Sequence, residues 1–95
     1  MKIRAKVKGT GERVEGCLVC RDGDPYIFLL DNRNRQYVYG MYKETIEFFI
    51  KGKWRNLVEG LEIYIEHIGE GSIPRGLLLY YREKVQEGKT GVHRQ

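Results

Sequence analysis

Long hydrophobic runs are absent from this sequence, and no apolar stretch approaches the roughly 20 residues that a membrane-spanning helix needs. The opening residues Met1 to Lys8 carry four cations and lack the apolar segment that a signal peptide contains. We therefore expect a cytoplasmic protein without a membrane partner. The two cysteines would stay reduced in that compartment.

Metal and cofactor motifs are equally scarce. Cys17-x-x-Cys20 is the one cysteine pair, and zinc knuckles hold this spacing on a tight turn so that both thiolates converge. Here the pair falls in a predicted strand, where residues three apart point to opposite faces. No second cysteine pair completes a site, so we interpret both residues as strand packing and expect no metal and no cofactor.

Catalytic motifs are also missing: there is no Gly-x-Gly-x-x-Gly, no P-loop and no Ser-His-Asp pattern. Two glutamate pairs, Glu44 with Glu47 and Glu62 with Glu66, have spacings that could hold a divalent ion, although solvated faces carry such pairs too. His67 is an isolated candidate base without a nucleophile nearby. We expect a protein that is not an enzyme, and a metal-dependent enzyme is the third-ranked alternative.

What is present suits one small soluble domain. The 95 residues are 41% hydrophobic and 32% charged, a globular rather than a disordered balance. We divide the single domain 1–95 into a β-rich part (1–50), a helical part (51–88) and a short basic tail (89–95). The formal net charge of +4 permits nucleic-acid binding without requiring it.

The first half predicts an antiparallel sheet organised around a hairpin from Pro25 to Tyr42, with residues 31–35 as its loop and Gly40 as a bend or bulge. Residues 2–8 alternate apolar and basic side chains, as a half-buried strand does. Further strands are expected at 13–20 and 45–50. We predict that Val14 pairs with Val7 and that Glu15 pairs with Lys6.

This half resembles small barrels of the Src-homology-3 type and the short accessory proteins of phages and prophages. The resemblance is carried by Lys2 to Glu15 at the start and by Glu44 to Ile50 at the end of the barrel. It implies a fold and a phage or mobile-element setting, and no activity. The expected fold class is α+β: a small antiparallel SH3-like barrel or curled sheet followed by a C-terminal helical hairpin.

The second half predicts two helices. Apolar residues from Trp54 to Ile68 recur in one helical stripe with Ile63 as the misfit, while residues 61–66 could instead form a strand of period two. Gly69 would end this helix. Ser72 would cap a second helix, 73–87, which would stop at Gly88.

The basic row on the first strand is the strongest functional signal. Its side chains share one face at intervals of about 6.8 Å, close to the spacing of phosphates along a nucleic-acid strand. The row could equally be a solvated face, or lysines that protect a sheet edge from aggregation. The row comprises Lys2, Arg4, Lys6 and Lys8.

The tip of the central hairpin is the second signal, because it brings guanidinium groups close to tyrosines. Such surfaces bind single-stranded nucleic acid or proteins, although a polar loop over a tyrosine-containing core has the same pattern. The candidate residues are Arg33, Arg35, Tyr37 and Tyr39.

We therefore expect a non-enzymatic binding module that contacts nucleic acid or a nucleic-acid-bound protein. The alternative is a phage-encoded protein that binds and inhibits a host protein, for example a defence-system component, through a Tyr/Arg surface. The sequence is also compatible with a homodimer that forms through the tyrosine-rich last helix.

Overall fold

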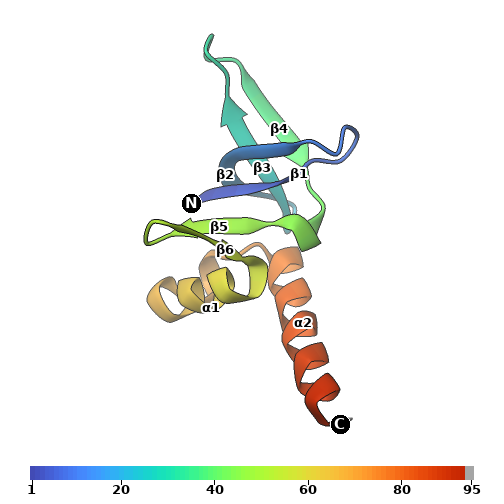
Figure 1. The fold of residues 1–95 in the computed structure, drawn as a ribbon. Helices are drawn as coiled ribbons and strands as arrows, with labels where there is room; N and C mark the ends of the chain where they lie inside the picture. Colours follow the sequence, from blue (N-terminus) through green and yellow to red (C-terminus); the bar gives the residue numbers. More distant parts are fainter. Residues whose placement is uncertain (94–95) are drawn as a thin grey trace.

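The computed structural model describes residues 1–93, with side chains described for residues 1–88. Six strands are followed by two helices (Figure 1). The elements are β1 (Lys2–Lys6), β2 (Arg13–Arg21), β3 (Asp24–Leu30), β4 (Gln36–Gly40), the 3-10 helix η1 (Lys43–Thr45), β5 (Glu47–Ile50), β6 (Lys53–Asn56), α1 (Leu57–Ile68), the 3-10 helix η2 (Glu70–Ser72) and α2 (Arg75–His93).

The strands form one antiparallel sheet in the order β4-β3-β2-β1-β5-β6. After Gly40 the chain turns away from β3, and Met41 forms an isolated bridge with Val7 beyond the end of β1. This contact curls the sheet without closing it. The predicted α+β class is confirmed, with an open curled sheet rather than a barrel.

The β1–β2 register differs from the predicted one by two residues: Val14 pairs with Ala5, and Glu15 pairs with Arg4. The cause is the connecting loop, in which Gly9 and Gly11 both adopt positive φ, so that the turn is longer than expected. Because the shift is an even number of residues, every side chain keeps its predicted face.

Trp54 belongs to β6 and not to the first helix, which corrects the predicted start of that helix. Lys51 and Gly52 both have positive φ and form a two-residue turn, so the chain returns beside β5 before it can become helical. The helix begins at Leu57, where the Asn56 side chain accepts a hydrogen bond from the Glu59 N–H. The helical interpretation of residues 61–66 is confirmed, as is Gly69 at the end of α1.

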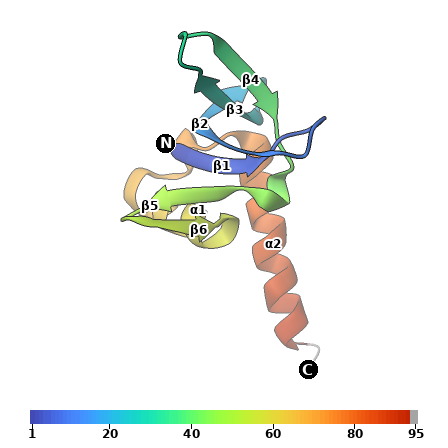
Figure 2. The ribbon, with the colours of Figure 1, turned by 45° about the horizontal axis from the view of Figure 1, so that its top comes forward.

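The second helix begins two residues later and ends later than predicted. Ile73 precedes Pro74 and is extended, as residues before proline usually are, so Ser72 lies in η2 rather than capping α2. Gly88 does not stop the helix, which continues to His93 and projects away from the sheet (Figures 1 and 2). Residues 89–93 of the expected tail are thus helical, and residues 94–95 lie outside the described part.

The core lies between the helices and the face of the sheet that they cover. In β1 the residues Ile3 and Ala5 are fully buried, while Lys2 and Lys6 on the opposite face are exposed. Buried residues of the other elements complete the core: Val7, Ile27, Met41, Ile46, Phe48, Leu57, Leu61, Ile73 and Leu77.

Gly60 allows α1 to pack directly on β5. A Cβ at Gly60 would lie 2.9 Å from the Cβ of the fully buried Phe48, closer than real Cβ contacts come. Glycine weakens a helix by about 1 kcal/mol relative to alanine, so here close packing outweighs helix propensity.

We expect Gly60→Ala to lower the free energy of unfolding, because the clash with Phe48 exceeds the roughly 1 kcal/mol gained in helix propensity. The matched control is Gly88→Ala in α2, where a Cβ meets nothing within 4 Å and should stabilise the protein. Urea denaturation of the three proteins measures both effects. A Gly60→Ala protein as stable as the Gly88→Ala protein would contradict this packing.

Candidate nucleic-acid interface

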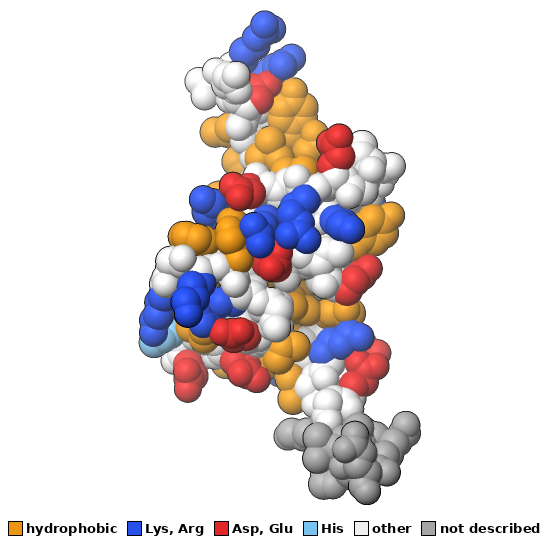
Figure 3. Space-filling model, in the orientation of Figure 1, with side chains coloured by type: hydrophobic (Ala, Val, Ile, Leu, Met, Phe, Trp, Pro, Cys, Tyr) orange, Lys and Arg blue, Asp and Glu red, His pale blue; other side chains and the backbone are white. Residues whose placement is uncertain are grey.

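The face of the sheet that the helices leave uncovered carries a group of basic side chains. We call it the outer face and define it by residues from β2, β1, β5 and β6. Figure 3 shows Lys and Arg side chains gathered over the middle of the sheet, with acidic side chains among them. The outer face comprises Lys2, Arg4, Lys6, Arg13, Glu15, Glu47, Phe49 and Trp54.

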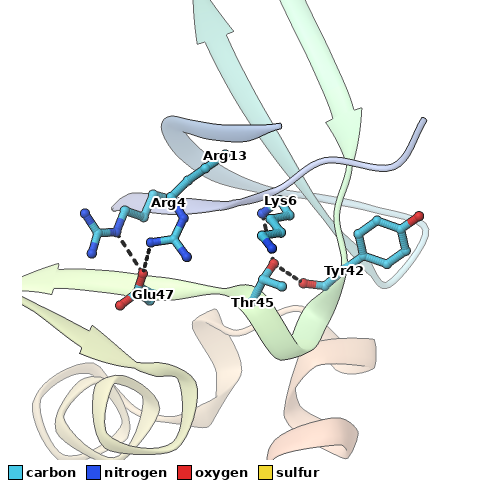
Figure 4. A network of polar contacts seen from close by, with 6 residues as sticks. All are labelled: Arg4, Lys6, Arg13, Tyr42, Thr45 and Glu47. Atoms are coloured by element: carbon cyan, nitrogen blue, oxygen red, sulfur yellow. Dashed lines mark hydrogen bonds and ion pairs between the residues drawn. The ribbon is translucent and has the colours of Figure 1, made fainter. Parts of the chain in front are cut away.

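Glu47 joins two arginines on the outer face. Its Oε1 atom accepts a hydrogen bond from Arg4 Nε at 2.8 Å and another from Arg13 NH1 at 3.0 Å (Figure 4). The hydrogen bond from Arg4 lowers the pKa of Glu47 below its usual value, partial burial opposes this, and the charges of Arg4 and Arg13 lower it further. Two guanidinium groups thus converge on one oxygen, an arrangement that also suits a phosphate oxygen.

Two aromatic rings extend this cationic surface on β5 and β6. Phe49 pairs with Trp54 across the strands, with ring centroids 5.1 Å apart in an edge-on arrangement. The Arg4 guanidinium lies 4.3 Å from the centroid of Trp54, and the Lys2 ammonium lies 5.1 Å from that of Phe49. These cation–π contacts hold the basic side chains beside the rings.

The predicted basic row is present, but it does not lie at an edge. β1 is paired with β2 on one side and with β5 on the other, so the interpretation of its lysines as edge protection is wrong. Lys2 and Lys6 are exposed, Arg4 is bound to Glu47, and Lys8 lies beyond the end of β1 close to Gly40.

The predicted tyrosines lie on the other face. Tyr37 and Tyr39 share a face with the buried Ile27, because Tyr39 pairs directly with it. Their rings are parallel within 4° with centroids 6.0 Å apart. The sheet therefore does not bring these two tyrosines together with the basic row of β1.

At the hairpin tip, Asp31 organises the loop. Its Oδ1 accepts backbone hydrogen bonds from Arg33 and Arg35, and its Oδ2 accepts from Arg35 Nε at 2.7 Å and from the Tyr37 hydroxyl. The hydrogen bond from the Arg35 N–H is the main cause of a lowered pKa at Asp31, while burial raises the pKa of Tyr37. At the tip, Arg35 therefore forms an ion pair with Asp31, whereas Arg33 donates to Asp31 through its backbone N–H.

The other candidate residues lie on β2, on η1 and β5, and on α1. Cys17 and Cys20 are exposed on opposite faces of β2. Among residues 1–88, whose side chains the structure describes, no three His, Cys, Asp or Glu side chains are grouped closely enough to hold a metal ion. Glu44 lies in η1, and Glu47, with which it could have held a divalent ion, is bound by arginines.

Sequence reasoning missed Arg13, Glu47 as an ion-pair centre, and the Phe49–Trp54 pair. A signal for the pair was available: Lys51-Gly52 is a glycine-containing turn between two β-prone segments, which is typical of a hairpin. In such a hairpin Phe49 and Trp54 become direct neighbours across the strands.

Comparison with protein-family models, with curated proteins and with solved structures finds no match to this chain. The resemblance of residues 1–50 to Src-homology-3-type barrels stays a prediction. In the part of the chain that the structure describes, neither helix is both long and apolar enough to cross a membrane.

The lowered pKa of Glu47 predicts an acid-dependent loss of stability. The ionised Glu47 carboxylate makes its full contribution to the free energy of unfolding above its unfolded-state pKa of about 4.5. This contribution is lost as the pH falls through the lower folded-state pKa. We expect Glu47→Gln to flatten the decline of the free energy of unfolding below pH 4.5, measured by urea denaturation.

The matched control for this experiment is Glu12→Gln, at an exposed carboxylate in the β1–β2 loop. It should leave the acid-dependent decline unchanged. Equal curves for wild-type and Glu47→Gln proteins would show that the ion pairs with Arg4 and Arg13 add nothing to stability.

Proposed function

We propose that this protein is a non-enzymatic module that binds nucleic acid, in single-stranded form, through its outer face. The observation that carries the proposal is the position of the exposed Lys2 and Lys6 on the strand next to the Phe49–Trp54 pair. The phage or mobile-element setting implied by the resemblance is part of the same proposal.

Single strands suit this surface better than duplexes, because their bases are free to stack on exposed rings while basic side chains contact the phosphates. Phe49 is 39% exposed, enough for a base to reach its ring. Lys2 and Lys6 are exposed at alternate positions of β1, with Arg4 between them. A contacted phosphate could replace Glu47 as the partner of Arg4 and Arg13.

The electrostatic part of binding should depend on Lys2 and Lys6. Each phosphate contact to a single strand contributes about 0.7 to the slope of log affinity against log salt, so the double change to Ala should lower that slope by about 1.4. Fluorescence anisotropy of a labelled single-stranded oligonucleotide at several salt concentrations measures the slope.

The control for the salt experiment is the double change Arg75→Ala and Lys84→Ala, which removes the same charge from α2 and should leave the slope unchanged. Glu47→Gln should strengthen binding, since it removes the competing carboxylate from Arg4 and Arg13. Dissociation constants weaker than about 10⁻⁴ M at low salt for every oligonucleotide would rule the proposal out.

The aromatic part of binding should depend on Phe49. Phe49→Leu keeps an apolar side chain but removes the ring, and loss of one stacked base typically weakens binding by about 1–3 kcal/mol. The salt slope should not change. Tyr37→Leu, which removes a ring on the core-side face of the sheet, is the control and should bind like wild type. If Tyr37→Leu weakens binding and Phe49→Leu does not, the contact surface is the hairpin and not the outer face.

A further inference from the structure

The N-terminal end of β1, the β5–β6 turn and the end of α1 lie on the same side of the molecule (Figures 1 and 2). Residues of these three segments line a groove. Its volume is about 500 Å³. Apolar side chains from both the sheet and the helix line it, chiefly Met1, Phe49, Ile63, Tyr64 and Ile68.

Three of these apolar residues are unusually exposed: Met1 at 37%, Phe49 at 39% and Ile68 at 59%. The docking of α1 on the sheet does not explain them, because Leu57, Gly60 and Leu61 form its buried face. Ile63, the misfit of the predicted helical stripe, also lines the groove. Apolar residues gathered at the surface in this way are typical of an interaction site.

The charged residues of the groove restrict what it can bind. Lys2, Lys51 and His67 line it, and none of its described lining residues is Asp or Glu. A second copy in a symmetric dimer would bring Lys2 and Lys51 against the same lysines, which is unfavourable. Nucleic-acid bases stack on flat rings, whereas Ile63 and Ile68 provide aliphatic walls.

We propose that this groove binds a short segment of a partner protein in which large apolar side chains are flanked by Asp or Glu. The apolar side chains enter between Ile63, Ile68 and Phe49, and the carboxylates pair with Lys2 and Lys51. This role goes beyond nucleic-acid binding by the outer face. The two surfaces share Lys2 and Phe49, so variants that separate them must lie elsewhere in the groove.

The first experiment is selection of binders from a random peptide library displayed on phage, with the full chain as bait. Enriched peptides should combine Asp or Glu with Leu, Ile, Phe or Trp. Enrichment of basic peptides, or enrichment of none, would overturn the proposal. A selected peptide, labelled with a fluorophore, then serves as the probe for anisotropy titrations.

Ile68→Ser tests the apolar wall of the groove. Because the Ile68 side chain is highly exposed, we expect the variant to fold like wild type. Loss of one buried Ile contact should weaken the peptide about ten-fold or more. The matched control is Leu79→Ser in α2, which is 52% exposed outside the groove and should leave peptide affinity unchanged. Equal weakening by both variants would mean nonspecific hydrophobic binding and would overturn the groove as the site.

Lys51→Asn tests the charge, since asparagine tolerates the positive φ of this turn position. It should weaken peptide binding and reduce the salt dependence of that binding, and Lys43→Asn in η1 should do neither.

Ile68→Ser also separates the two proposed surfaces, because the affinity for an oligonucleotide should not change in this variant. If Ile68→Ser weakens oligonucleotide and peptide alike, the groove belongs to the nucleic-acid surface. If the wild-type protein sediments as a dimer and Ile68→Ser sediments as a monomer, the groove binds a second copy of the chain. Either result rejects the acidic segment.

Discussion

The alternation of side chains along β1 is the constraint on which the rest of the structure depends. β1 is paired on both sides in the middle of the sheet, and its inward residues Ile3 and Ala5 are fully buried. Because successive side chains of a strand point to opposite faces, burial of these residues sends Lys2, Arg4 and Lys6 to the outer face. One local rule thus produces both the core and the basic surface.

Basic residues so close together repel one another, and the neighbouring strands compensate for part of that repulsion. Glu47 on β5 binds Arg4 and Arg13, and Glu15 on β2 lies directly opposite Arg4. Lys2 and Lys6 remain exposed at either side of this ion-paired centre. The outer face therefore has an ion-paired middle with exposed cations at either side, which suits the weak, salt-sensitive binding that we propose.

The proposed nucleic-acid surface and the proposed peptide groove meet at the same corner of the sheet. The Phe49 ring contacts Trp54 edge-on in the outer face, and Phe49 also lines the groove. Lys2 belongs to both the outer face and the groove. A protein segment in the groove would thus lie beside a bound strand. The two binding events would therefore oppose each other, because both ligands would be acidic and both would use Lys2 and Phe49.

Local patterns in the sequence determined the β1 alternation, the hairpin with its loop at residues 31–35 and the end of α1 at Gly69, since each depends on neighbouring residues, whereas they left residues 61–66 open between helix and strand. Only the tertiary structure decided that Tyr37 and Tyr39 face the core side, that Glu47 joins Arg4 to Arg13, and that Phe49 and Trp54 form a pair. These relations depend on strand order, on register and on two tight turns. They involve residues distant in the chain, and the packing of the whole sheet against its helices selects them.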